Sequence, residues 1–184
     1  MKKVALVPLV LVLAATAACS RSTDTPINSA ASPSQTVELA SGGLTTGSRG
    51  LHHSNLLQFG ASRATVVSQL SGILGSPSRT GRNANCSSGP VDFVSFGALD
   101  LHFEGGLFTG WVLDEAGKPE LQSYHGLSVG DRRDGLDADA DIEVDANSSL
   151  GTELSFNGIG VLLSGPRPSD RVTTLFSGTT CFAR

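Results

Sequence analysis

Three short apolar runs lie so close together along the chain that only one kind of connection can join them. The runs cover residues 91–96, 99–103 and 107–113, with two or three residues between neighbours. Connections this short join antiparallel strands, because a parallel crossover needs a dozen or more residues. The spacing therefore predicts a three-stranded antiparallel meander.

The middle run of this meander alternates between apolar and polar residues. Successive side chains of a strand point to opposite faces of the sheet. One face should carry Leu99, Leu101 and Phe103. The opposite face should carry Asp100, His102 and Glu104. We take these three polar residues, together with Trp111, as a candidate surface for a partner, since tryptophan is enriched in interface hot spots.

A helix is expected before the meander, over residues 63–74. Ser62 can cap its first turn, and Gly75 followed by Pro77 should end it. Five apolar residues fall on one helical face: Val66, Val67, Leu70, Ile73 and Leu74. Because Gly72 and the β-branched pair weaken the intrinsic propensity, we expect the helix to be stabilised by packing on the apolar face of the meander.

Part of this pattern recurs later in the chain. Five positions match others exactly 70 residues downstream: Leu57, Phe59, Gly60, Arg63 and Val66 correspond to Leu127, Val129, Gly130, Arg133 and Leu136. Residues 154–158 also resemble residues 101–105, and two further strands are expected at 159–163 and 172–176. The recurrence predicts an internal duplication.

The predicted fold class is α+β, with a tandem duplicated unit of a helix packed on a three-stranded antiparallel meander. The first unit should cover residues 51–122 and the second residues 123–184. The helix of the second copy should be degenerate, because Gly135 and the aspartates of residues 134–141 are poor helix formers.

The segment from Gly60 to Pro77, with its Gly-x-Ser-Arg start and Leu-Gly-x-Pro end, is similar to the helix that opens the small lipoproteins of the bacterial barrel-assembly complex. A tandem pair of such units resembles the β-lactamase inhibitory proteins, and the general outline resembles exported actinobacterial proteins of unassigned function. The resemblance implies helices on an antiparallel sheet, no cofactor, and an exposed sheet face that binds another protein. The chain departs from the inhibitors in having one Trp and one Tyr, so no inhibitory target is carried over.

The first residues have the order of an export signal. Lys2 and Lys3 precede an apolar run over residues 4–13, and small residues lead to Cys19. The run is too short to span a bilayer. The pattern resembles a lipoprotein signal, so residues 1–18 should be removed and Cys19 should carry a lipid. The alternative is an ordinary secretory signal cut after Ala17. Either processing places the mature chain outside the cytoplasm, and the lipid would anchor it to the cell membrane or envelope.

The cysteine count favours lipidation. The chain has three cysteines, and an exported protein with an odd number retains one thiol without a partner. A lipid on Cys19 leaves Cys86 and Cys181 as an even pair in an oxidising compartment. We therefore expect a disulfide between Cys86 and Cys181.

Residues 19–50 are expected to form a flexible linker. They are rich in Ser, Thr, Ala, Pro and Gly, and Leu39 and Leu44 stand isolated among them. Segments of this composition bury too little apolar surface to offset the entropy lost on ordering.

Charge argues against a nucleic-acid partner. Loss of Lys2 and Lys3 with the leader lowers the 13 basic residues further below the 17 acidic ones. The arginines are scattered rather than gathered into a basic stripe, and an acidic chain is repelled by phosphate.

Acidic residues alternate with apolar ones from Asp137 to Asp145, which raises the possibility of a calcium site. A helix-loop-helix calcium site needs glycine at its sixth position and glutamate at its twelfth, where this chain has Ile142 and Ser148. We interpret the segment as a half-buried strand with a solvated acidic face, and leave cation binding open.

No other pattern assembles a metal centre or catalytic group. Asp100, His102 and Glu104, with His52 and His53, could contribute metal ligands, but their spacing does not define a zinc site. Ser62 lacks the second glycine of a nucleophile elbow.

We therefore expect a noncatalytic protein-recognition module, anchored to a membrane through Cys19, that binds another envelope protein. A small-ligand carrier and a secreted inhibitor are the alternatives. An enzyme is the least favoured class, because no acid, base and nucleophile converge.

Overall fold

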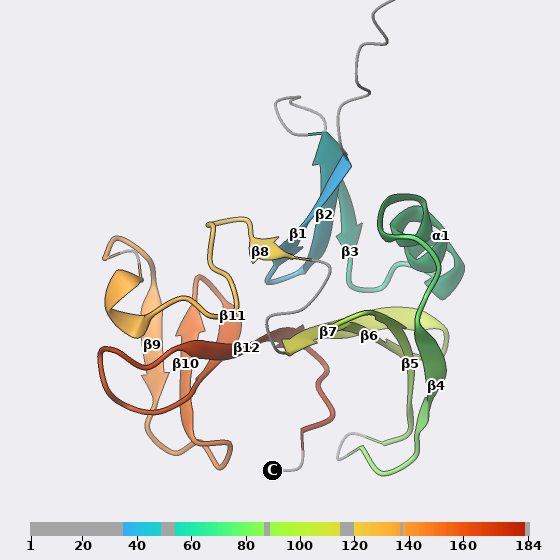
Figure 1. Ribbon diagram of the computed structural model, residues 1–184. Helices are drawn as coiled ribbons and strands as arrows, with labels where there is room; N and C mark the ends of the chain where they lie inside the picture. The colour runs from blue at the N-terminus through green and yellow to red at the C-terminus, as the bar shows by residue number, and fades with distance from the viewer. Residues whose placement is uncertain (1–34, 49–53, 87–88, 115–119, 137, 183–184) are drawn as a thin grey trace, which may run out of the picture. The chain divides into compact units, whose positions relative to one another are not determined.

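The computed structural model describes residues 35–48, 54–86, 89–114, 120–136 and 138–182. Two sheets, one α-helix and one 3-10 turn account for its regular structure (Figure 1). None of the helices in these ranges is long and apolar enough to cross a bilayer.

The small sheet has four strands in the order β3-β2-β1-β8. Their bounds are Gln35–Ala40 for β1, Gly43–Ser48 for β2, Ser54–Gln58 for β3 and Gln122–Ser123 for β8. Strands β1, β2 and β3 are antiparallel neighbours, whereas β8 pairs with β1 in parallel.

The large sheet has eight antiparallel strands in the order β4-β5-β6-β7-β12-β11-β10-β9. Its first meander consists of β4 (Arg79–Asn83), β5 (Val91–Phe96), β6 (Leu99–Glu104) and β7 (Leu107–Asp114). Its second meander consists of β9 (Ile142–Asp145), β10 (Thr152–Phe156), β11 (Ile159–Leu163) and β12 (Val172–Gly178). Pairing of β7 with β12 joins the two meanders edge to edge.

Helix α1 spans Arg63–Leu74, as the sequence predicts. The Ser62 hydroxyl accepts a hydrogen bond from the Thr65 amide at 3.2 Å, which confirms the predicted cap. The C-cap is Gly75. Val66 and Leu70 are fully buried, and the helix contacts β1 and β7.

The predicted fold class is wrong. The structure is mostly β, with two sheets, and α1 lies between the small sheet and β7 instead of covering a three-stranded meander. The sequence prediction missed β4, whose residues Arg-Thr-Gly-Arg-Asn offer no apolar alternation, and it missed the small sheet. The small sheet and α1 together cover the inner face of the large sheet.

The linker prediction is wrong for residues 35–48, which form β1 and β2. Val37, Leu39 and Leu44 are buried in the core. The hairpin around Ser41 and Gly42 brings these apolar residues together on one face of the small sheet. Burial of that face stabilises the strands. The composition of the segment does not reveal this burial, because the apolar residues are far apart in sequence. Residues 19–34 lie outside the described ranges.

One apolar core lies between the inner face of the large sheet and the covering elements. Trp111 is fully buried there, and its Nε1 donates to the carbonyl of Ala40 at 3.0 Å. Ser177 on β12 donates from its hydroxyl to the carbonyl of Ser41 at 2.6 Å. Both hydrogen bonds tie the β1-β2 turn to the large sheet.

The segments after Gly60 and Gly130 hold equivalent backbone positions. Each precedes its meander and makes three backbone hydrogen bonds with the start of the meander's last strand and the turn just before it. Before the first meander they run from Gly60 N to Phe108 O (2.7 Å), Phe108 N to Ala61 O (2.9 Å) and Arg63 N to Gly106 O (2.9 Å). Before the second they run from Gly130 N to Val172 O, Val172 N to Asp131 O and Arg133 N to Asp170 O, each 2.8 Å.

The later half of the predicted correspondence is displaced by one strand. Phe156 pairs with Ile159 across the turn Asn157-Gly158, as Phe96 pairs with Leu99 across Gly97-Ala98. Residues 154–158 therefore match the end of β5 in sheet position, not the end of β6. Where α1 follows Ser62, the second segment forms only the 3-10 turn η1 (Arg133–Gly135).

Candidate functional site

The outer face of the large sheet, turned away from the small sheet and α1, holds a cavity of about 580 Å³ over the first meander. We call it the outer-face pocket. Its floor is formed by residues of β5, β6 and β7: Val91, Phe93, Asp100, His102, Val112 and Asp114. Its walls are formed by the end of β4 with the loop after it and by the C-terminal segment: Arg79, Arg82, Asn83, Ala84, Asn85, Cys181 and Phe182.

Strand register explains why these residues meet. One row across the sheet places Arg79 beside Ser95, Ser95 beside Asp100 and Asp100 beside Val112. The next row places Phe93 beside His102. Since side chains alternate between faces, both rows point away from the core. The polar set predicted for the middle strand is thus the outward set.

The two carboxylate oxygens of Asp100 in the pocket floor have different surroundings. Its Oδ2 lies 3.5 Å from Nη2 of Arg79, and the Asp100 side chain is 27% exposed. Its Oδ1 is buried and has no hydrogen-bond partner among the described residues. The neighbouring Ser95 is fully buried, and its Oγ likewise lacks a partner in that part of the chain.

Arg79 bridges the carboxylate and an aromatic ring. Its guanidinium carbon lies 5.7 Å from the centroid of Phe93, within the range of a cation–π contact. Its side chain remains 65% exposed because β4 is the edge strand of the sheet. Arg82, on the same strand, pairs instead with Asp92 at 3.7 Å.

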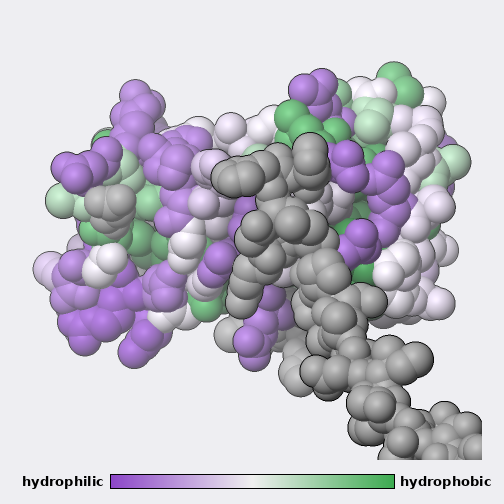
Figure 2. Space-filling model, turned by 90° about the horizontal axis from the view of Figure 1, so that it is seen from above, coloured by the Kyte–Doolittle hydropathy of each residue, from purple (hydrophilic) through white to green (hydrophobic). Residues whose placement is uncertain are grey.

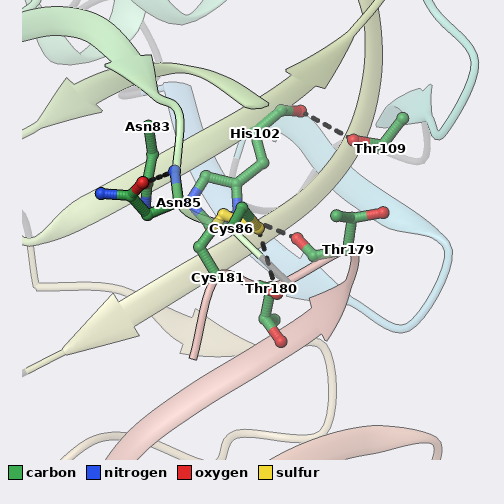
Figure 3. Close-up of a disulfide and its surroundings, with 8 residues drawn as sticks. All are labelled: Asn83, Asn85, Cys86, His102, Thr109, Thr179, Thr180 and Cys181. Carbon is green, nitrogen blue, oxygen red and sulfur yellow. Dashed lines mark hydrogen bonds between the residues drawn. A yellow bond between two sulfur atoms is a disulfide. The ribbon is translucent and has the colours of Figure 1, made fainter. Parts of the chain in front are cut away.

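His102 is buried in the floor and does not present a free ring to a partner. Its Nδ1 lies 2.8 Å from the carbonyl oxygen of Thr179, so it holds the C-terminal segment on the outer face. Figure 3 shows His102 beside the disulfide, with Thr179 and Thr180 next to them. Gly110 permits this close approach, because a Cβ there would lie 2.1 Å from the carbonyl oxygen of Thr179.

The predicted disulfide between Cys86 and Cys181 is confirmed. The two Cα atoms are 4.8 Å apart across a sequence separation of 95 residues. The bond fastens the C-terminal segment to the loop after β4, and Phe182 then packs edge-on against Phe176 with ring centroids 5.1 Å apart. Both covalent and aromatic contacts therefore hold one wall of the pocket in place.

The four residues predicted as a partner surface separate in the structure. Asp100 and His102 line the pocket. Glu104 is partly buried at the end of β6 and is not part of the pocket lining. Trp111 points to the opposite face of the sheet and lies in the core, so it contacts Ala40 rather than solvent.

The acidic stretch is a short edge strand and not the half-buried strand that the sequence predicts. All four residues of β9 are exposed, including Ile142 at 38% and Val144 at 57%. Asp137 lies outside the described ranges. Figure 2 shows hydrophilic residues gathered at the left of the molecule, where the second meander lies.

The described residues contain no group of three or more His, Cys, Asp or Glu placed to hold a metal ion. His52 and His53 fall outside them. The Ser62 hydroxyl caps α1 and lies 2.8 Å from the hydroxyl of Thr65.

Sequence reasoning missed Arg79, Phe93 and the C-terminal residues as parts of this site. The sequence analysis predicted the strand that contains Phe93 but not the face of the sheet to which this side chain points. Arg79 lies in a strand that the sequence pattern does not reveal. The cysteine pairing was the available signal for the C-terminal wall, since a bond from Cys86 to Cys181 must bring residue 182 near the loop after β4. Comparisons of the chain with protein-family models, with curated proteins and with solved structures find no match.

Proposed function

We propose that the protein is a noncatalytic recognition module of the cell envelope, held at a membrane by a lipid on Cys19, that binds a protein partner with the outer face of the first meander. The observation that carries the proposal is the outer-face pocket. Arginine and aromatic side chains, which are enriched at protein interfaces, form much of it: Arg79, Phe93 and Phe182. Its volume suits side chains of a partner entering from solvent.

The fixed walls of the pocket support recognition. The disulfide and the His102–Thr179 hydrogen bond restrain the C-terminal wall of the cavity, and the β4-β5 ladder restrains the wall formed by β4. A surface already held in its bound form loses less conformational entropy on association. A partner would therefore meet a prepared site.

The disulfide also supports the location outside the cytoplasm. A stable bond between two distant cysteines is typical of oxidising compartments. Pairing of Cys86 with Cys181 leaves Cys19 as the one cysteine available for a lipid. The leader and the cysteine arrangement thus agree on export.

A small-ligand carrier is the second candidate, and the pocket volume of about 580 Å³ favours it because small-molecule sites have volumes in this range. Protein recognition is preferred because a long, charged side chain at the wall of the pocket, that of Arg79, reaches solvent. A side-chain exposure of 65% leaves the guanidinium group of Arg79 accessible to a large partner.

Photo-crosslinking in intact cells tests the proposal. A photoreactive residue in place of Asn85, at the rim of the pocket, should give one discrete protein adduct. The matched control replaces Ser149, an exposed residue of the second meander, and should give none. Adducts of equal yield from both positions, or none from Asn85, would contradict the proposal. A gain of small-molecule mass at Asn85 without a protein would favour the carrier.

Metabolic labelling with radioactive palmitate tests the anchor. The wild-type chain should take up label and sediment with membranes, and Cys19→Ser should lose both properties. The double variant Cys86→Ser/Cys181→Ser should keep the label, because its Cys19 is intact. Label retained by Cys19→Ser would contradict the lipid attachment.

A further inference from the structure

We propose that the partner adds an extended segment to the free edge of β4, as a further antiparallel strand of the large sheet. In the added strand an apolar residue lies beside Gly81, over the ring of Phe93, and a carboxylate lies beside Arg82. This inference rests on the proposed function and specifies how the partner approaches the outer-face pocket. Three features of the described residues carry it: the open main chain of β4, the position of the Phe93 ring, and an excess of positive charge at this edge.

Strand β4 is an edge of the large sheet, and in the described part of the chain β5 is the only strand that pairs with it. The Ser95 carbonyl accepts a hydrogen bond from the Ser78 amide at 2.8 Å, so the main-chain groups of Ser95 point toward β4. Arg79 pairs with Ser95, and its own groups point toward β5. Because this direction alternates along a strand, the groups of Thr80 and Arg82 point away from β5. These two amides and two carbonyls form a template for an added strand.

Phe93 reaches the edge of the sheet because Gly81 has no side chain. The two residues pair across β4 and β5, and a Cβ on Gly81 would lie 2.7 Å from Cζ of Phe93. The ring of Phe93 therefore lies over Gly81 on the outer face, where it is only partly buried and lines the outer-face pocket. An apolar residue of the added strand beside Gly81 would bury its side chain against this ring.

The charges along this edge favour an acidic residue beside Arg82. Asp92 is approached by both Arg82 and Arg63, at 3.7 and 3.9 Å. Two guanidinium groups thus share one carboxylate, which leaves an excess of one positive charge in this cluster. Arg79, in contrast, is balanced by Asp100 at 3.5 Å. A carboxylate of the added strand beside Arg82 would balance the excess charge, because opposite charges on neighbouring strands attract.

A second copy of the chain does not match this edge. Two β4 strands would bring arginines together, and like charges on neighbouring strands are destabilising. In the acidic edge strand β9, the Asp141 carbonyl accepts from the Asn157 amide at 2.8 Å, so the outward groups belong to Ile142 and Val144. Pairing of those groups with β4 would place the carboxylate of Glu143 over the aromatic ring. The occupant is therefore a segment of another protein.

An NMR titration of the full chain in detergent with a designed peptide tests the inference. The probe is capped Thr-Glu-Ile-Thr-Val, whose glutamate and isoleucine match Arg82 and Gly81 in an antiparallel strand. We expect the amide protons of Thr80 and Arg82 to shift downfield and to exchange more slowly. The outward amides of Ile142 and Val144, at the other edge of the same sheet, are the matched control and should not change.

Three results of this titration would overturn the inference. The first is an absence of shifts at β4, and the second is equal shifts at β4 and β9. The third is a dependence of the β4 amide shifts on the concentration of the chain without peptide, which would identify a second copy as the occupant.

Methylated peptides separate strand addition from contact through side chains alone. In the added strand the amide of the glutamate points to β4, whereas the amide of the isoleucine points away from it. Methylation of the glutamate amide removes a hydrogen bond and should weaken binding at least about tenfold. Methylation of the isoleucine amide should change the affinity less than about threefold. Any other pattern would overturn the inference.

Arg82→Gln tests the charged contact. In the wild-type chain, replacement of the peptide's glutamate by glutamine should weaken binding about threefold, in keeping with an exposed ion pair. This preference for glutamate should disappear in Arg82→Gln. It should persist in Arg79→Gln, the matched control on the same strand, because Asp100 already balances Arg79. A preference that persists in Arg82→Gln, or that is absent from the wild type, would overturn the inference.

Crosslinking in cells separates this inference from the proposed function. Thr80→Pro removes an outward amide, and proline is tolerated at such a position of an edge strand. It should lower the yield of the Asn85 adduct at least about fivefold. Val144→Pro, at the equivalent position of β9, should leave the yield unchanged. If the yield is unchanged in Thr80→Pro, only the inference fails. If the peptide adds to β4 but Asn85 gives no adduct, the inference stands and the proposed function fails.

Discussion

The segments before the first and second meanders of the large sheet make the same three backbone hydrogen bonds, which we call the backbone anchor. After the backbone anchor, however, the two segments take different forms. In both, a glycine with positive φ, Gly60 at 91° or Gly130 at 98°, turns the chain into the same three hydrogen bonds. After Ser62 the chain continues as a helix of 12 residues, whereas after Arg132 it makes one 3-10 turn. The anchor therefore does not require a helix.

The difference lies in the residues that follow the anchor. Ser62 caps its helix, and buried Val66 and Leu70 then pack it against β1 and β7. Arg132 provides no cap, and its guanidinium instead binds the Asp134 carboxylate at 2.6 and 2.8 Å. Gly135 follows at once, so the second segment has neither the cap nor the apolar stripe that a helix needs.

The outer faces differ as well. The first meander carries the pocket and its C-terminal wall, while the second meander has the exposed acidic strand β9 at the edge of the sheet. Glu153 on β10 accepts a short hydrogen bond from the Ser148 hydroxyl and is buried. The proposed recognition surface lies on the first meander, so the proposal can be tested by comparing matched positions of the two meanders.

The largest effect on stability is expected at Phe108 and Val172, the buried residues that take part in the two backbone anchors. Phe108 and Val172 hold equivalent positions, but only Phe108 packs against other rings, those of Phe59 and Phe103. Phe108→Ala should lower the free energy of unfolding by about 3–5 kcal/mol. Val172→Ala should lower it by about 2 kcal/mol. Urea unfolding measures both, and a larger loss in Val172→Ala would reverse our ranking of the two anchors.

Removal of the disulfide should affect the first meander selectively. The variant Cys86→Ser/Cys181→Ser should lose about 2–5 kcal/mol of unfolding free energy, because a long loop is no longer closed in the unfolded chain. Amide exchange should accelerate most in residues 179–182, which the bond fastens to the pocket. If amide exchange accelerates equally in β9–β11, the stabilising effect of the disulfide is not confined to the first meander.

Loss of the helix cap is expected to have an intermediate effect. Ser62→Ala removes the acceptor of the Thr65 amide and should cost about 1 kcal/mol of unfolding free energy. Arg132→Ala, at the equivalent position, removes no cap and should cost less than about 0.5 kcal/mol. Thermal unfolding of the two variants compares them directly, and equal losses would show that capping does not distinguish the segments.

The smallest effect concerns the pH dependence of the second segment. Hydrogen bonds from Arg132 hold the pKa of Asp134 below its ordinary value. A carboxyl group with a lowered pKa in the folded state contributes stability above its unfolded pKa and loses that contribution as pH falls through the folded pKa. In Arg132→Ala the pKa of Asp134 should rise. NMR titration of the Asp134 carboxyl carbon measures this, and an unchanged pKa would exclude Arg132 as the cause.

Local patterns were enough to predict much of the secondary structure. The cap and stop residues place α1 at Arg63–Leu74, and alternation with short turns predicts β5, β6, β7, β11 and β12. The 70-residue offset identified the two segments that share an anchor. These signals are local because capping, periodicity and hairpin turns each act within a few residues.

Features that depend on distant contacts were missed. Leu39 and Leu44 look isolated in the sequence but meet across a hairpin and reach the core. Strand β4 has no apolar face, so pairing with β5 alone defines it. The site shows the same limit, because alternation identified Asp100 and His102 as outward residues, whereas Arg79 required the position of an unrecognised strand.

Hydrogen–deuterium exchange of the full chain on cell-envelope membranes, compared with the same chain in detergent, tests the central claim most directly. We expect slower exchange on the membranes in residues 79–114 and 179–182, which contain the pocket, and unchanged exchange in residues 142–163 of the second meander. Slower exchange confined to residues 142–163, or no difference between the two preparations, would contradict the assignment of recognition to the first meander.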